Sequence, residues 1–199
     1  MPSKLSFTKQ HAETTLVEYF KLANISELSP TSLPIPVKDI ADSHYRIYVG
    51  KSDSLAEKLP DSVQTRWMNS SLSGLLLVGP RVKEIWVSAA EAERSQGRER
   101  FTIAHELGHF LLHIGKSTSS SNFFACRETD IHRPTSSRNR RRREVEANRF
   151  AAELLMPEQL IEKMARQWKA NIPKMSNLFS VSAEAMGIRL TQFGLLPVL

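Results

Sequence analysis

Five consecutive residues, His105-Glu106-Leu107-Gly108-His109, hold the side chains of this chain that are best suited to chemistry. On an α-helix, positions four apart face the same side, so both imidazoles can bind one Zn²⁺ ion. Glu106 then lies where a general base for water at the metal is needed. Apolar residues recur with helical spacing around this motif and predict a helix over residues 96–114. The alternative is a surface helix that carries two histidines by chance.

A catalytic zinc site needs a third protein ligand. A third histidine ten residues after the first is excluded, because Gly115 occupies that position. His113 is four residues beyond His109, but it has rotated around the helix relative to His105, and we expect it to support the site or pack in the core.

The next predicted helix, from Arg143 to Leu155, offers two carboxylates, Glu144 and Glu146. Helical spacing places Glu144 on the apolar stripe of this helix and rotates Glu146 away from its centre. Glu144 is therefore the favoured third ligand, and Glu146 stays the alternative. Asn148 lies on the same side as Glu144 and is suited to hydrogen-bond a metal ligand. The stripe consists of Ala147, Phe150, Ala151, Leu154 and Leu155.

Length and composition favour one modest domain with a small appendage. The chain has 199 residues, of which 41% are apolar, enough to bury a core. Its single cysteine, Cys126, fits a reducing compartment, and no signal-peptide pattern or membrane-spanning run is visible, so we expect a cytoplasmic protein. The predicted boundaries are 1–170 for a zincin-like domain and 171–199 for a C-terminal helical segment.

The net charge of +6 comes mostly from one segment. Between Arg127 and Arg149 there are eight arginines and four acidic residues, with the arginines concentrated over 138–143. This concentration fits an electrostatic patch for nucleic acid or an acidic partner, but a solvated loop is the favoured interpretation.

The remaining pattern predicts several helices and a few short strands. Residues 51–69 form a polar stretch with little pattern, and 116–143 are expected to be a loop. The predicted elements are a helix at 11–24, a helical turn at 37–41, a strand at 45–50, a hairpin of strands 73–78 and 82–88, a helix at 157–170, and two short helices after 172 with a turn near 181–182.

Residues 178–190 have the pattern of a helix-turn-helix. A DNA-reading helix needs basic or amide side chains, and here only Arg189 and Gln192 qualify. A packing or partner-docking segment is therefore favoured, and DNA binding is possible but not favoured.

The two motifs together resemble the ImmA/IrrE family of metallo-endopeptidases. The resemblance rests on the His-Glu-Leu-Gly-His motif, on the element Glu144-x-x-Ala147-Asn148-x-Phe150-Ala151, and on the flanking stretches Arg100–Ala104, Ser73–Leu76 and Leu154–Pro157. It extends over about residues 30–196. The resemblance implies a gluzincin-like α+β fold, in which a small mixed or antiparallel sheet is backed by the motif helix, with Zn²⁺ as cofactor and Glu144 as third ligand. The Ser- and Arg-rich segment 116–143 departs from the family pattern.

The resemblance also implies a regulatory zinc endopeptidase that cleaves a specific protein partner, typically a helix-turn-helix repressor of a mobile element or stress regulon. In that interpretation His105, His109 and Glu144 bind the metal, Glu106 is catalytic, and Asn148 supports a ligand. An extended substrate is expected along an exposed sheet edge, and the order of the strands in the chain makes strand 82–88 the candidate for that edge. The alternatives are a zinc-containing regulator that binds DNA or a partner, and a toxin–antitoxin component without general protease activity. No membrane association is expected.

Overall fold

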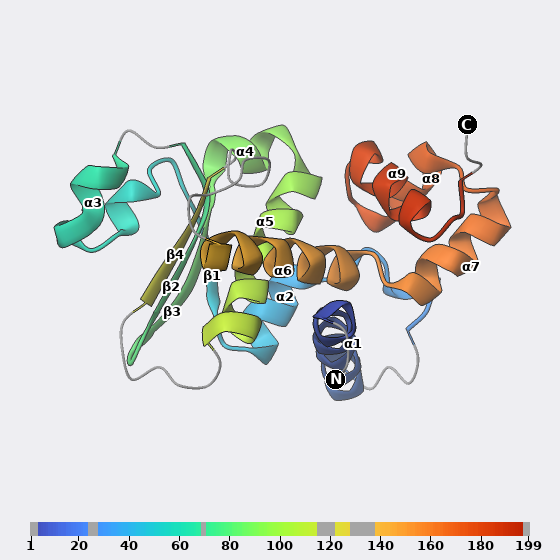
Figure 1. Cartoon of the computed structure of the whole chain (residues 1–199), viewed down its shortest axis with the longest axis horizontal. Helices are drawn as coiled ribbons and strands as arrows, with labels where there is room; N and C mark the ends of the chain where they lie inside the picture. The colour runs from blue at the N-terminus through green and yellow to red at the C-terminus, as the bar shows by residue number, and fades with distance from the viewer. Residues whose placement is uncertain (1–3, 24–27, 69–70, 115–121, 128–137, 197–199) are drawn as a thin grey trace.

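The computed structural model describes residues 4–23, 28–68, 71–114, 122–127 and 138–196. A sheet packs against helix α5 (Gln96–His109), α5 packs against α6 (Arg138–Leu155), and α1 (Lys4–Leu22) also packs against α6 (Figure 1). The predicted α+β class is confirmed. The motif helix is the central layer of this arrangement.

The sheet has four strands in the order β1-β3-β2-β4. β2 (Leu72–Gly79) and β3 (Val82–Ser88) form the predicted antiparallel hairpin, and β4 (Asn122–Arg127) pairs with β2. β1 (Tyr48–Ser52) lies parallel to β3, so the sheet is mixed. It begins three residues later than predicted, since Arg46 has a φ of 55°, which interrupts the extended backbone.

The prediction that strand 82–88 forms an exposed sheet edge is wrong. β3 is paired on both sides, with β1 and with β2. The order of the strands in the chain suggested that β3 is an edge strand. Instead β1 pairs with it in parallel, and the local sequence pattern does not reveal this pairing. Among the described residues, the edges of the sheet are β1 and β4.

The motif helix is close to its predicted bounds. The Ser95 side chain caps α5 by accepting a hydrogen bond from the backbone N–H of Arg98. After His109 the helix widens into a π-helical turn, η4 (Phe110–Ile114), which is a common deviation near functional sites.

The second motif helix begins earlier than predicted. The arginine-rich run 138–143 was expected to be loop, but it forms the first turns of α6, and its side chains are exposed. Apolar periodicity could not reveal these turns because they contact no core, whereas arginine itself is a good helix former. The rest of the predicted loop is divided: 122–127 form β4, and 115–121 and 128–137 lie outside the described residues.

The polar stretch 51–69 contains more structure than predicted. It holds η3 (Ala56–Lys58) and α3 (Asp61–Trp67), and its buried Leu55 and Leu59 form a small second core with Leu72 and Leu75 of β2. A short helix not predicted from the sequence, α4 (Ala89–Arg94), connects β3 to α5.

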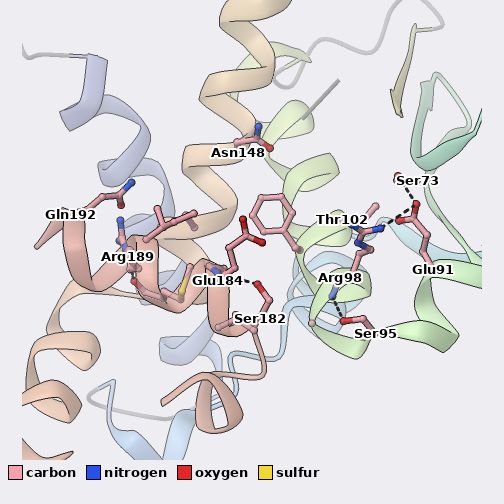
Figure 2. A pocket seen from close by; sticks show the side chains of 17 residues that line it. Ser73, Glu91, Ser95, Arg98, Thr102, Asn148, Ser182, Glu184, Arg189 and Gln192 are labelled. Atoms are coloured by element: carbon pink, nitrogen blue, oxygen red, sulfur yellow. Dashed lines mark hydrogen bonds and ion pairs between the residues drawn. The ribbon is translucent and has the colours of Figure 1, made fainter. Parts of the chain in front are cut away.

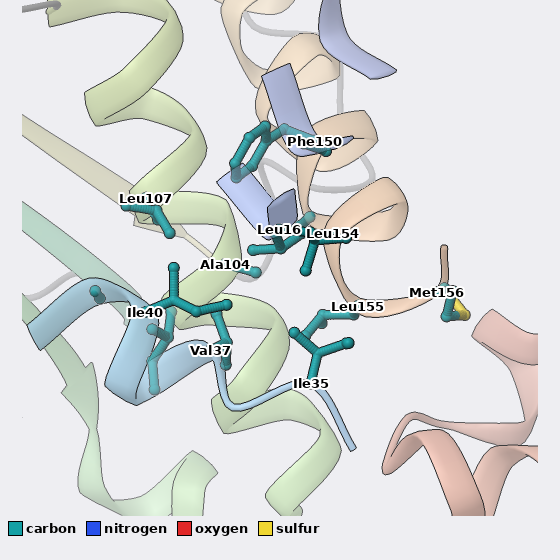
Figure 3. Close-up of a cluster of buried hydrophobic side chains, with 14 of the residues drawn as sticks. Leu16, Ile35, Val37, Ile40, Ala104, Leu107, Phe150, Leu154, Leu155 and Met156 are labelled. Atoms are coloured by element: carbon teal, nitrogen blue, oxygen red, sulfur yellow. The ribbon is translucent and has the colours of Figure 1, made fainter. Parts of the chain in front are cut away.

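The main core lies between α1, α5, α6 and the segment that follows α1. That segment contains η1 (Pro30–Ser32), α2 (Val37–Asp39) and η2 (Ile40–His44), which cover the predicted helical turn. Figure 3 shows Leu16 of α1, Ile35 and Ile40 of this segment, Leu107 of α5 and Phe150 of α6 meeting in one cluster. All five are buried, so this cluster holds the two motif helices in their relative orientation.

The C-terminal part forms α7 (Glu158–Trp168), α8 (Ile172–Phe179) and α9 (Ala183–Gln192), close to the predicted helices. Ser180 at the end of α8 has a φ of 52°, and Ser182 caps α9. α9 is attached to the end of α6 through Arg189, which is 4% exposed and pairs with Glu153. The proposed boundary after residue 170 stays a prediction. No helix in the described part of the chain is long and apolar enough to cross a membrane.

Candidate metal centre

The two histidines of the motif lie side by side on α5. Their ring centroids are 4.6 Å apart, and the Nε2 atoms of His105 and His109 are 3.0 Å apart. Both side chains are about 1% exposed. The four-residue helical spacing therefore brings two imidazole nitrogens to one buried point, as the sequence predicted.

Glu144 of α6 reaches the same point from the facing helix. Its Oε2 lies 3.3 Å from Nε2 of His105 and 3.5 Å from Nε2 of His109. This approach depends on small residues, because a Cβ added to Gly108 would lie 3.0 Å from the Phe150 ring and 3.3 Å from the Ala147 backbone. Gly108 and Ala147 thus let α5 and α6 come close enough for the three side chains to meet.

The other candidate ligands lie elsewhere. Glu146 faces His113, with 3.8 Å between Oε2 and Nδ1, and its second oxygen pairs with Arg142. The Nε2 atom of His113 lies 3.1 Å from the backbone oxygen of Arg143. Glu146 and His113 therefore contact each other and the N-terminal part of α6, and the His113 ring also packs beside that of His109, with 5.3 Å between the ring centroids.

Asn148 contacts one of the histidines. Its Oδ1 lies 2.8 Å from Nδ1 of His105. With the proton on Nδ1, the imidazole donates to Asn148, and the lone pair of Nε2 faces His109 and Glu144. A partner of this kind sets the tautomer and the orientation of a metal-binding histidine.

Glu106 is fully buried, and neither of its carboxylate oxygens has a hydrogen-bond partner among the residues that the structure describes. It lies against Gly74 of β2, where an added Cβ would be 2.6 Å from Oε1 of Glu106 and 2.5 Å from Cγ2 of Thr102. Gly74 therefore provides the space for this carboxylate. A glycine inside a strand is the sequence signal that could have indicated such a close approach.

The electrostatics of the cluster follow from its burial. Burial, reinforced by the charge of Glu144, raises the pKa of Glu106 well above its usual value. Burial also lowers the pKa of His109 to about 4, despite its hydrogen bond to Glu144. For Glu144 burial alone would raise the pKa, but hydrogen bonds with His105 and His109 outweigh it and lower the pKa.

This donor set fits a divalent cation. His105, His109 and Glu144 each offer one ligand atom, and these atoms lie within 4.8 Å of one another. Tetrahedral zinc with bonds of about 2.0–2.1 Å needs ligand atoms about 3.3 Å apart, and the observed separations of 3.0, 3.3 and 3.5 Å bracket that value. The carboxylate of Glu144, whose lowered pKa keeps it ionised, would also place negative charge at this point that a divalent cation balances.

The fold resembles that of a larger solved protein. A structure described as a Mycobacterium tuberculosis transcriptional regulator superposes with a TM-score of 0.52 at 16% sequence identity. The match covers 96% of this chain and 47% of that one, so the present chain spans about half of its length. At this identity the likeness concerns the fold alone. No curated protein matches the sequence significantly.

The sequence also matches a known family over more than half of its length. Residues 78–191 match the profile of Peptidase_M78, described as the IrrE N-terminal-like domain. This region contains both motif helices, and the buried His-His-Glu group able to bind a metal agrees with a family of metallopeptidases. The resemblance expected from the two motifs is thereby confirmed, and the chain belongs to the Peptidase_M78 family of IrrE N-terminal-like domains.

Proposed function

We propose that this protein is a zinc-dependent regulatory endopeptidase that hydrolyses a peptide bond in a specific protein partner. The observation that carries the proposal is the meeting of His105, His109 and Glu144 at one buried point, with the unpartnered carboxylate of Glu106 on the same helix. A site that served structure alone would have no need of a buried base beside its ligands.

His105 and His109 would hold the metal through Nε2, and Glu144 through Oε2. Two imidazoles and one carboxylate suit zinc and leave a coordination position open. A bound zinc ion would supply Lewis acidity, polarising a carbonyl and lowering the pKa of water. Asn148 would keep the His105 ring in its ligand orientation through the 2.8 Å contact with Nδ1.

Glu106 would move the proton in this reaction. As water attacks the peptide carbonyl, a carboxylate oxygen of Glu106 takes one of its protons. The same oxygen then gives this proton to the amide nitrogen as the C–N bond breaks. Because neither oxygen has a hydrogen-bond partner among the described residues, no other described group competes with the water for this carboxylate.

A substrate strand is best accommodated along β4 rather than β3. β4 is an edge strand in the described part of the chain, and Cys126 is opposite Gly74 in its register with β2. Gly74 is the residue that contacts Glu106, so a strand added beside β4 would extend the half of the sheet that contacts the base, with β4 between it and Gly74. Family membership supports a protein substrate, and we propose a helix-turn-helix repressor as its class.

The test is co-expression with the helix-turn-helix regulator encoded nearest to this gene. Zinc content is measured by mass spectrometry of the metal, and cleavage by intact mass of the regulator. Wild type should bind one zinc and cleave the regulator at a single bond. Glu106→Gln should keep the zinc and lose the cleavage. Absence of stoichiometric zinc, or full activity of Glu106→Gln, would overturn the proposal.

One observation favours the alternative of a nucleic-acid-binding or partner-binding regulator. The first turns of α6 expose a run of arginines, Arg140–Arg143. Arg189, however, is buried in an ion pair with Glu153 and is not available to read DNA from α9. A duplex that shifts in a salt-sensitive manner with wild type, but not after Arg140–Arg143 are changed to glutamine, would support this alternative.

A further inference from the structure

A cavity of about 430 Å³ lies between α5, α6 and α9, beside the metal centre. Figure 2 shows Ser73, Glu91 and Arg98 together on one side, Arg189 and Gln192 on the other, and Asn148 where α6 borders the space. The volume is in the range of pockets that bind small ligands or a few residues of a peptide. The wall is largely apolar and includes Phe101, Ala152, Met156, Val181, Ala185 and Ile188.

One end of the cavity is acidic. Glu91 of α4 is 7% exposed, and its Oε1 accepts a hydrogen bond of 2.8 Å from the Ser73 hydroxyl. Arg98 lies 3.9 Å from the same oxygen. The other oxygen, Oε2, is buried and has no hydrogen-bond partner within the described part of the chain. A buried carboxylate oxygen without a donor is costly, so a donor brought by a ligand would satisfy it.

The cavity adjoins the residues assigned to chemistry. Asn148 lines it and also contacts Nδ1 of His105. Thr102 lines it as well, and its methyl group and Oε1 of Glu106 lie against the same glycine, Gly74. A group that occupies the cavity therefore lies one side chain away from both a metal ligand and the general base.

At the opposite end, the guanidinium of Arg189 is committed to other groups, and Glu184 is an exposed carboxylate that water can satisfy. Arg189 donates to Glu153 and to the backbone oxygen of Met156. The unsatisfied oxygen of Glu91 is thus the polar feature that a ligand can complete. The complementary ligand has an apolar body and ends in a cationic hydrogen-bond donor.

We propose that this cavity is a substrate-specificity pocket that receives a lysine or arginine side chain close to the scissile bond. The ammonium or guanidinium donates to Oε2 of Glu91, and the aliphatic stem packs on the apolar wall. The remaining volume takes part of a neighbouring residue. This inference rests on the proposed peptidase function, because it assigns the cavity to the substrate.

The first experiment measures binding and needs no cleavage. Hexylammonium and 1-hexanol share an apolar body and differ in the charged donor. Each is titrated at pH 7 into the zinc-loaded full chain labelled with ¹³C at the methionine methyl groups. Met156 lines the cavity and its resonance should shift, whereas the exposed Met68 should not respond.

Wild type should bind hexylammonium about tenfold more tightly than 1-hexanol, as expected for one charge-assisted hydrogen bond. Glu91→Gln should make the two affinities equal. Glu93→Gln, which removes an exposed carboxylate from the same helix, should retain the preference. Ala185→Phe fills the cavity and should abolish binding of both probes, which keeps the test decisive if Glu91→Gln does not fold. Equal affinities in wild type would overturn the proposal.

The second experiment measures cleavage of a peptide library derived from a digested proteome. The peptides that wild type cleaves should be enriched in lysine or arginine at one position near the scissile bond. The peptides that Glu91→Gln cleaves should lack this enrichment. Cleavage without enrichment would overturn the pocket assignment. Wild type could cleave no peptide and still bind hexylammonium more tightly than 1-hexanol. That result would count against the peptidase proposal and would support the recognition of a cationic group by the pocket. A purely structural role of Glu91 would change the melting temperature and leave both preferences intact.

Discussion

The amide oxygen of Asn148 lies 2.8 Å from Nδ1 of His105 and links α6 to the first histidine of the motif on α5. The same helix supplies Glu144, one turn earlier, to the opposite nitrogen of that ring. One imidazole is therefore held at both nitrogens by two residues of α6.

Replacement of Asn148 by alanine should weaken zinc binding by about 10–100-fold, because the His105 ring loses the partner that orients it. The affinity is measured by competition with a fluorescent chelator. Arg149→Ala alters an exposed neighbour on the same helix and is the control. Equal affinities of the two variants would show that the contact with Nδ1 does not position the ligand.

The two glutamates of α6 should differ in their effect on metal content. Glu144→Gln removes the carboxylate that faces both histidines and should lower zinc occupancy to a small fraction after dialysis. Glu146→Gln affects only the contacts with His113 and Arg142 and should retain one zinc per chain. Metal analysis of both proteins checks this expectation, and the opposite order would identify Glu146 as the ligand.

Gly74→Ala should impair the base without removing the metal ligands. The new Cβ would collide with Glu106 and Thr102, so the variant should lose about 1–3 kcal/mol of unfolding free energy. Its activity per folded molecule should fall as well, because the carboxylate is displaced. Gly50→Ala creates a similar collision with Trp86, away from the centre, and is the matched control. It should lose stability but retain activity per folded molecule.

The ion pair that attaches α9 to α6 should matter for stability. The Arg189 and Glu153 side chains are only 5% and 15% exposed. Arg189→Ala leaves a buried carboxylate without its partner and should cost about 3–5 kcal/mol of unfolding free energy, measured by urea denaturation. Arg166→Ala removes an exposed pair with Glu162 and should change it by less than about 1 kcal/mol. The double variant Arg189→Met with Glu153→Leu has neither charge. If it regains the lost stability, the loss is due to the unpaired charge of Glu153.

β3 alternates between more and less exposed residues, so its periodicity is visible in the sequence. β2 and residues 102–109 of α5 are buried almost throughout, and they were predicted from the turn residues Gly79-Pro80-Arg81 and from the His-Glu-Leu-Gly-His motif. The first turns of α6 and the helix α3 were missed because few of their side chains contact the main core.

Residue spacing on single helices was enough to place His105 beside His109 and to prefer Glu144 over Glu146, because helical geometry is local. The order of the strands, and with it the interior position of β3, depended on a parallel pairing between distant segments. Gly74 beside Glu106, Asn148 beside His105, and Glu91 in its cavity likewise bring together side chains from different elements. Such contacts are decided by how the layers pack, and only the tertiary structure contains that information.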